Sequence, residues 1–184
     1  MTHSGHAGES AKSKERRIKE KFFENYCNGK GIDIGCGDNP LTDEIEKWDK
    51  QDGDACYMRG VENESFDFVY SSHCLEHLDF PHLALQNWFR ILKTGGFLIV
   101  CVPHRDLYEK KRMLPSLWNE EHKSFWLPDK DDPPNTFSLK AFIEKWLTGF
   151  EIIEMKVCSD GATKIAVNQH STGEYQIECI IKKL

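Results

Sequence analysis

The segment GIDIGCGDN, residues 31–39, has the composition of a turn that holds a ligand. A short apolar run carries one acid, Asp33, and leads into two glycines, Gly35 and Gly37. Glycine lets the backbone approach a ligand that a Cβ atom would push away. The spacing is not that of a dinucleotide fingerprint, because Pro40 stands where the third glycine should be, and the Gly-Lys-Ser/Thr end of a phosphate loop is absent. The motif predicts either a ligand turn of another class or a glycine turn that only redirects the chain.

A second group of side chains that can do chemistry lies in SSHCLEHL, residues 71–78. His73 and His77 stand four residues apart with Cys74 between them, and imidazole and thiolate both bind zinc. No further ligand set with recognisable spacing accompanies them. The sequence therefore predicts no metal site.

Length, composition and charge limit the kinds of protein this can be. The chain has 184 residues, and we expect one domain over residues 14–184 after a disordered segment at 1–13. No apolar run approaches the roughly 18 residues of a membrane span, and a formal net charge of −6 argues against nucleic acid as a partner. The seven cysteines include no CxxC pair, which suits a reducing compartment. These features predict a cytoplasmic protein without membrane contact.

Hydrophobic periodicity predicts an α/β fold with a parallel core and an antiparallel end. Near-continuous apolar runs are typical of strands buried on both faces of a parallel sheet, and an amphipathic helix separates two of them. The charged run KSKERRIKEK, residues 12–21, is interpreted as the solvent-exposed face of a helix. Helices are expected at residues 14–28, 40–45, 81–93 and 138–147, and strands at 30–35, 66–72, 97–102, 150–158 and 175–183.

Several elements in a fixed order carry a resemblance to a known family. The turn with Asp33 is followed by Asp49, by Asp54-Ala55, by SSHCLEHL and by LKTGG at residues 92–96. This ordered set resembles the class I S-adenosylmethionine-dependent methyltransferases, methyltransferase domain 11 type. The resemblance implies a Rossmann-like fold: a mostly parallel seven-stranded sheet with an antiparallel last strand and helices on both faces. It also implies S-adenosyl-L-methionine as cofactor and S-adenosyl-L-homocysteine as product.

The resemblance assigns cofactor contacts residue by residue. The glycine turn would lie under the methionine and ribose of the cofactor, and Asp54-Ala55 would meet the adenine. An acid after the second strand would accept hydrogen bonds from the ribose hydroxyls. The full expected set is Asp33, Gly35, Cys36, Gly37, Asn39, Asp49, Asp54, Ala55, Ser71, Ser72, His73 and His77.

Two departures from the family pattern concern this set. Asn39 stands where the family has a glycine, and only twelve positions separate Gly37 from Asp49, so the first helix must be shortened. The ribose acid is therefore either Asp49 or Asp52. We favour Asp49, because Trp48 ends the short strand-like stretch before it.

Methyl transfer to a hydroxyl needs a base, and histidine titrates near neutral pH. His104 directly follows the 97–102 strand, where loop residues face the ligand crevice, and it is the first candidate. His122 is the second, and Tyr108 and His73 complete the set. Residues 103–137, which contain three of these candidates, lack periodicity and are predicted to form a substrate lid.

These features predict a metal-independent methyltransferase that acts on a small molecule. The Asn/Asp-Pro-Pro-aromatic segment of related enzymes that methylate base or glutamine nitrogens is absent after the 66–72 strand. We expect O-methylation of a sugar or another hydroxylated metabolite, by analogy with the fold family. The alternatives are N-methylation of a small amine and a non-catalytic S-adenosylmethionine-binding regulatory or partner subunit. A homodimer is compatible with each of them.

Overall fold

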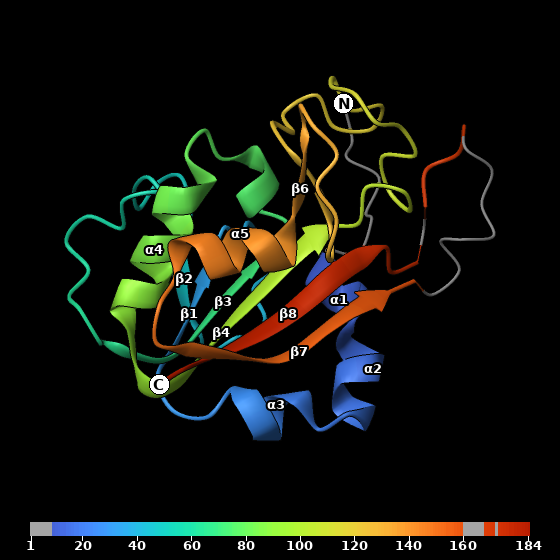
Figure 1. Cartoon of the computed structure of the whole chain (residues 1–184). Helices are drawn as coiled ribbons and strands as arrows, with labels where there is room; N and C mark the ends of the chain where they lie inside the picture. Colours follow the sequence, from blue (N-terminus) through green and yellow to red (C-terminus); the bar gives the residue numbers. More distant parts are fainter. Residues whose placement is uncertain (1–8, 160–167, 172) are drawn as a thin grey trace.

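A six-stranded sheet carries the fold, in the order β2-β1-β3-β4-β8-β7 (Figure 1). The computed structural model describes residues 9–159, 168–171 and 173–184. The strands of this sheet are β1 (Gly31–Ile34), β2 (Glu46–Trp48), β3 (Phe66–Ser72), β4 (Leu92–Pro103), β7 (Phe150–Cys158) and β8 (Gln176–Lys183). The helices are α1 (Glu9–Lys12), α2 (Lys14–Lys19), α3 (Phe22–Tyr26), α4 (Pro81–Ile91) and α5 (Leu139–Trp146), with a short 3₁₀ helix η1 (Leu75–His77).

The strand directions confirm the predicted Rossmann-like fold and correct the predicted strand count. β2, β1, β3 and β4 run parallel, whereas β8 is antiparallel to both of its neighbours, β4 and β7. The sheet has six strands, where the resemblance implies seven. Residues 49–65, between β2 and β3, form only turns and irregular backbone. This segment is rich in Gly, Asp and Asn, which favour turns, so the parallel half of the sheet ends at β2.

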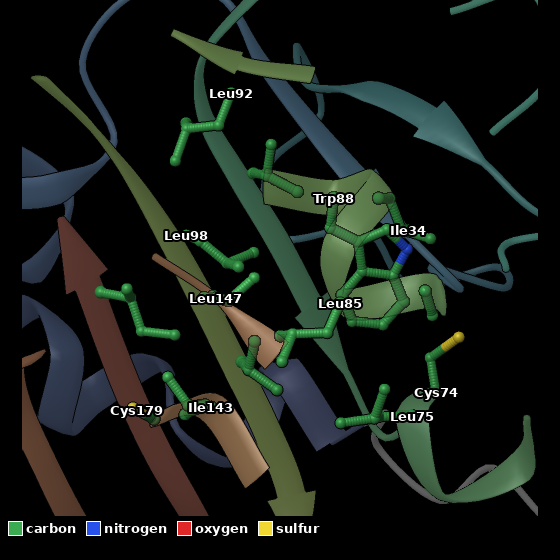
Figure 2. Close-up of a cluster of buried hydrophobic side chains, with 14 of the residues drawn as sticks. Ile34, Cys74, Leu75, Leu85, Trp88, Leu92, Leu98, Ile143, Leu147 and Cys179 are labelled. Atoms are coloured by element: carbon green, nitrogen blue, oxygen red, sulfur yellow. The ribbon is translucent and has the colours of Figure 1, made fainter. Parts of the chain in front are cut away.

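Helices cover both faces of the sheet, as predicted (Figure 1). On one face, α4 and α5 pack on β1, β3, β4 and β8 through a large apolar cluster. Figure 2 shows Leu85 and Trp88 of α4, Leu98 of β4 and Ile143 of α5 in this cluster. The buried side chains of α4 lie on one face of the helix and fix its place against the sheet; they are Ala84, Leu85, Trp88 and Ile91.

The opposite face of the sheet is covered by α3. Phe22 packs there against Tyr70 of β3 and Ile99 of β4. The preceding strand residues, Val69 and Leu98, belong to the cluster on the other face. This alternation is the two-residue period of a strand, so both faces of β3 and β4 are apolar, as their sequences predict.

The N-terminal segment differs from the single exposed helix that the sequence predicts. The helix is broken at Lys21, which has a φ of +54°, into α2 and α3. The predicted exposed face is also wrong at Arg17, whose side chain is buried and forms an ion pair with Glu178 of β8. Of the segment expected to be disordered, residues 9–12 form α1 and Ser13 is buried, whereas residues 1–8 lie outside the described residues.

Residues 40–45, predicted to be helical, contain turns and bends instead. The amide of Leu41 donates to Asp33 Oδ2 at 2.8 Å, so a side chain of β1 holds the start of this segment. This contact ties the segment to Asp33, the acid that precedes the glycine turn.

The predicted lid, residues 103–137, lies beyond the carboxyl end of β4 (Figure 1). It contains β5 (Phe125–Leu127), which pairs in parallel with β6 (Thr136–Ser138). Arg105 and Arg112 both donate to Asp132 and join the two ends of the segment. Among the described residues, no helix combines the length and the apolar character that crossing a membrane requires.

Candidate active site

The carboxyl ends of β1, β2 and β3 surround a cavity of about 790 Å³. Gly35 follows β1, Trp48 ends β2 and His73 follows β3, so three neighbouring strands deliver residues to one edge of the sheet. Ligands of open parallel sheets bind at this edge. The cavity is lined by Gly35, Trp48, Asp49, Lys50, Gly53, Asp54, Ala55, His73, Cys74, His77, Leu78, Glu120, Glu121 and Lys123.

The two glycines of the turn have different reasons to be glycine. Both have positive φ, +77° at Gly35 and +52° at Gly37. A Cβ atom on Gly35 would lie 2.6 Å from Cys74 Cβ and 2.7 Å from its Sγ, so the residue is also required by packing. A Cβ atom on Gly37 would meet nothing within 4 Å, and its amide donates to Asp49 Oδ2 at 2.7 Å. The open space at Gly37 is what a backbone that approaches a ligand needs.

We expect Gly35→Ala to be the more damaging of two matched substitutions. Gly37→Ala strains the backbone alone and should lower the free energy of unfolding by about 1 kcal/mol. Gly35→Ala adds the overlap with Cys74, and overpacking should bring the total loss to about 2 kcal/mol. Urea unfolding of both variants without cofactor measures the difference. Equal losses of unfolding free energy would show that the overlap between residue 35 and Cys74 is relieved at no cost.

Asp33, the acid that precedes the turn, lies beneath it rather than in the cavity wall. Its side chain is 1% exposed, and it accepts the hydrogen bond from Leu41. Burial raises the pKa of Asp33 to about 7, although the Leu41 amide and the charge of Arg17 oppose this shift. Asp33 therefore holds the chain after the turn in place, and its contact with a ligand would be indirect.

Asp49 is the carboxylate that connects β2 to the glycine turn. Its Oδ2 accepts from the Gly37 amide and its Oδ1 from the Lys50 amide, each at 2.7 Å. Asp52 accepts from the Asp49 amide at 2.9 Å and does not line the cavity. Of the two acids that the sequence leaves open for the ribose, Asp49 is the one that reaches the cavity.

The predicted adenine pair, Asp54 and Ala55, also lines the cavity. Asp54 Oδ1 accepts from the Cys56 amide at 2.8 Å and closes a tight turn. The Ala55 carbonyl accepts from the indole nitrogen of Trp88 at 2.9 Å, so α4 anchors this loop from the core. A buried helix residue thereby fixes the loop that carries these two cavity residues.

Among the catalytic candidates, His73 reaches the cavity. It directly follows β3, has a φ of +54°, and its Nε2 lies 3.0 Å from Gln176 Oε1 of β8. His77, expected near the cofactor, lines the cavity as well. Burial, followed by the charge of His122, lowers the pKa of His77 to about 4, so its ring is neutral at pH 7.

The other catalytic candidates do not line the cavity. His104, the first choice from the sequence, accepts a hydrogen bond at Nδ1 from the Asp106 amide at 3.2 Å, and burial lowers its pKa. His122 and Tyr108 lie buried behind the cavity wall, with ring centroids 5.4 Å apart. All three lie in residues 103–137, and the sequence does not indicate which side chains of that segment turn toward the cavity.

Five expected cofactor residues besides Asp33 do not line the cavity, and one of them is Gly37, whose amide donates to Asp49. Ser71 Oγ donates to the Ile34 carbonyl at 2.9 Å and joins β3 to β1. Cys36 and Asn39 belong to the turn, and Ser72 ends β3 beside Ser71. These side chains support the residues that reach the cavity.

The sequence analysis missed eight lining residues. Trp48 is the most informative, because its indole nitrogen is buried and has no hydrogen-bond partner among the described residues. Its place directly before Asp49 is the signal that could have found it. The others are Lys50, Gly53, Cys74, Leu78, Glu120, Glu121 and Lys123.

A family model described as a methyltransferase domain matches residues 9–154, most of the chain. The chain belongs to the class I S-adenosylmethionine-dependent methyltransferase family. It is therefore a transferase that uses S-adenosylmethionine, as its motifs predict. The matching model is Methyltransf_23, so the narrower domain 11 type stays a prediction.

Several solved structures have the same fold as this methyltransferase. The PH0226 protein of Pyrococcus horikoshii OT3 is 13% identical with a TM-score of 0.58, covering 100% of this chain and 95% of that one. A SAM-dependent methyltransferase of Archaeoglobus fulgidus is 15% identical with a TM-score of 0.53, covering 92% and 94%. A chain from a Haloferax volcanii complex that contains the Trm112 methyltransferase activator is 13% identical with a TM-score of 0.54, covering 95% and 97%. No curated protein sequence matches this one.

Proposed function

We propose that this methyltransferase methylates a hydroxyl group of a small polar acceptor, such as a sugar or another hydroxylated metabolite. One observation carries the proposal: a single cavity is lined by Asp49 and Asp54 on one side, by His73, and by three charged lid residues, Glu120, Glu121 and Lys123. Small-molecule sites occupy about 300–1,000 Å³. The cavity of about 790 Å³ lies in the upper part of that range, which suits a cofactor and a small acceptor together.

The residues present fit S-adenosylmethionine. The Gly37 backbone borders open space, Asp49 presents a carboxylate to hydroxyl donors, and Trp48 has an indole N–H without a protein partner in the described residues. We propose that Gly37, Asp49 and Asp54 hold the ribose and adenine. The bound cofactor supplies an electrophilic methyl group. The protein aligns the acceptor and removes its proton.

We assign the base role to His73. Gln176 donates its amide to Ser13 Oγ at 2.9 Å, so its oxygen faces His73 and accepts from Nε2. Nδ1, which lies 3.7 Å from Oε1 of the buried Glu76, is the nitrogen that we expect to take the proton. Among the non-glycine residues that line the cavity, all of them described, His73 alone has positive φ. Backbone strain of this kind is concentrated at functional sites.

The lid role of residues 103–137 belongs to the same proposal. Three residues of this segment line the same cavity as the expected cofactor residues; they are Glu120, Glu121 and Lys123. Charged groups at that position favour an acceptor with several hydroxyls or charges over an apolar one.

The test is a screen with methyl-labelled cofactor against sugars, nucleotide sugars, phenols and amines, followed by two variants. His73→Asn keeps a residue that tolerates positive φ but cannot act as a base. We expect it to lower kcat at least tenfold with the best hydroxyl acceptor, whereas His104→Asn changes kcat little. The reverse pattern would reassign the base to His104. Preferred turnover of amines, with little effect of either variant, would support N-methylation instead.

The family assignment does not favour the non-catalytic role considered from the sequence, and the second candidate is catalysis that depends on a partner protein. The Haloferax volcanii complex contains the Trm112 methyltransferase activator. A protein partner would fit a chain that binds cofactor but turns over no acceptor alone. Calorimetry with S-adenosylmethionine, combined with the acceptor screen, separates the cases: binding without turnover of any acceptor class would favour the partner-dependent role.

A further inference from the structure

A carboxylate and two imidazoles meet behind the cavity wall from two distant parts of the chain. Glu76 and His77 belong to η1, and His122 belongs to the lid. One ligand atom of each lies within 4.8 Å of the other two. Glu76 is fully buried and His122 is 5% exposed, so this set, which we call the Glu76 cluster, is inside the protein.

The distances within the Glu76 cluster are those of atoms gathered around a centre. Glu76 Oε1 lies 3.8 Å from His77 Nε2 and 3.8 Å from His122 Nε2. These contacts are too long for hydrogen bonds. Ligand atoms around a tetrahedral zinc ion, with metal–ligand distances of about 2.0–2.2 Å, stand roughly 3.3–3.6 Å apart. A contraction of a few tenths of an ångström would bring Glu76 Oε1 to that distance from each imidazole nitrogen.

A second carboxylate orients His122 toward this centre. His122 Nδ1 lies 2.5 Å from Glu109 Oε1, and Glu109 is itself buried and accepts from Ser116. The Nδ1–H therefore donates to Glu109, and the lone pair is on Nε2, the atom that faces Glu76. Histidines that bind metals commonly donate their other nitrogen to a carboxylate in this way.

The Glu76 cluster adjoins the cavity at His77. The His77 side chain is 26% exposed and lines the cavity, whereas Glu76 and His122 close the site from behind. An ion held by three protein ligands would keep an open coordination position on the cavity side, as catalytic zinc sites with two histidines and one glutamate do.

We propose that Glu76, His77 and His122 bind one divalent transition-metal ion, of the zinc type, in the wall of the cavity, and that Glu109 positions His122 for this. The sequence favours no metal, because Glu76 and His122 are far apart in the chain and their spacing matches no motif. The site does not depend on the identity of the methyl acceptor. A proton shared between Glu76 and the histidines is the competing explanation of the same cluster.

The test uses the full chain without a polyhistidine tag, stripped with a chelator and titrated with Co²⁺ and then Zn²⁺. We expect one Co²⁺ per chain, with visible absorption bands of a low-coordinate site, and displacement by one Zn²⁺. Glu76→Gln and His122→Gln should abolish stoichiometric binding, and Glu109→Gln should weaken it about 10–100-fold. His82→Gln, which changes a histidine stacked on Trp146 outside the cluster, should bind normally.

Two outcomes would overturn the proposal. Failure of the wild-type chain to take up one equivalent of either ion at micromolar concentration would leave the shared proton as the explanation, and this result needs no variant. Unchanged uptake by folded Glu76→Gln and Glu109→Gln would place the ion elsewhere. Circular dichroism confirms that each variant is folded before its titration is interpreted.

Discussion

Replacing Glu178 with glutamine is expected to lower the free energy of unfolding by about 3–5 kcal/mol. Arg17 Nη2 and Nε donate to Glu178 Oε2 at 2.7 and 2.9 Å, and both side chains are almost completely buried. The other two partners of the Arg17 guanidinium are neutral groups, Tyr70 and Cys101. Without Glu178 the guanidinium is left buried without its counterion, and breaking a buried pair in this way is strongly destabilising.

The reciprocal variant, Arg17→Met, should be milder. Glu178 also interacts with Arg16 at 3.0 Å and with Lys156 at 3.4 Å, and both of these cations remain in the variant. A double variant, Arg17→Met with Glu178→Gln, buries no charge at either position and should be more stable than Glu178→Gln alone. Urea unfolding of the three variants measures these differences. Equal losses in both single variants would contradict the asymmetry.

The pH dependence of stability provides a second readout of the same pair. Burial alone would raise the pKa of Glu178, but the charge of Arg17 and hydrogen bonds from Arg16 outweigh it and lower the pKa to about 2. A carboxyl group whose pKa is lowered in the folded state stabilises the protein at pH values above its ordinary pKa, near 4.5. This contribution is lost as the pH falls toward 2. The stability gap between wild type and Glu178→Gln should therefore narrow between pH 5 and the lowest pH at which both stay folded.

Asp49→Asn is expected to weaken S-adenosylmethionine binding about 100-fold, because hydrogen bonds to a charged group contribute about 1.5–3 kcal/mol each. Asparagine keeps one acceptor oxygen for the Gly37 amide, and the amide of the exposed Lys50 can bond to water in its place, so the turn should survive. The loss then reports on the ligand hydroxyls rather than on folding. Isothermal calorimetry with the cofactor measures the affinity, and thermal unfolding without cofactor checks the fold.

Asp52→Asn is the matched control for Asp49. Asp52 accepts from the Asp49 amide and does not line the cavity, so affinity should stay within about threefold of wild type, a difference below 1 kcal/mol. A large loss in Asp52→Asn together with a small one in Asp49→Asn would assign the ribose to Asp52. Equal large losses would show that the two acids act as one unit.

The sequence predicts much of the fold and of the cofactor side of the site. The strands at 66–72 and 150–158 and the helix near 139–146 are found at or near the expected residues, because short-range hydrophobic periodicity reflects which side of an element is buried. Gly35 directly follows β1, Asp49 directly follows β2, and Asp54 lies in the loop after β2. All three line the cavity because it lies at the carboxyl ends of these parallel strands.

Other features depend on contacts between residues that are distant in the chain. The charged run at 12–21 looks solvent-exposed in sequence, yet Arg17 is buried because Glu178 supplies a counterion from the last strand. The large sheet has six strands because residues 49–65 form turns, and hydrophobic periodicity alone did not reveal this. Local patterns carry no information about such partners.

The order of motifs along the chain by itself determined the family, the cofactor and the edge of the sheet where the cavity lies. The tertiary structure alone decided which side chains meet there: His73 in the cavity wall, His104 outside it, and His122 beside Glu76. The physical reason is that strand and helix periodicity is a local property of the backbone. The direction of a lid side chain, in contrast, depends on the whole packed arrangement of the sheet, η1 and residues 103–137.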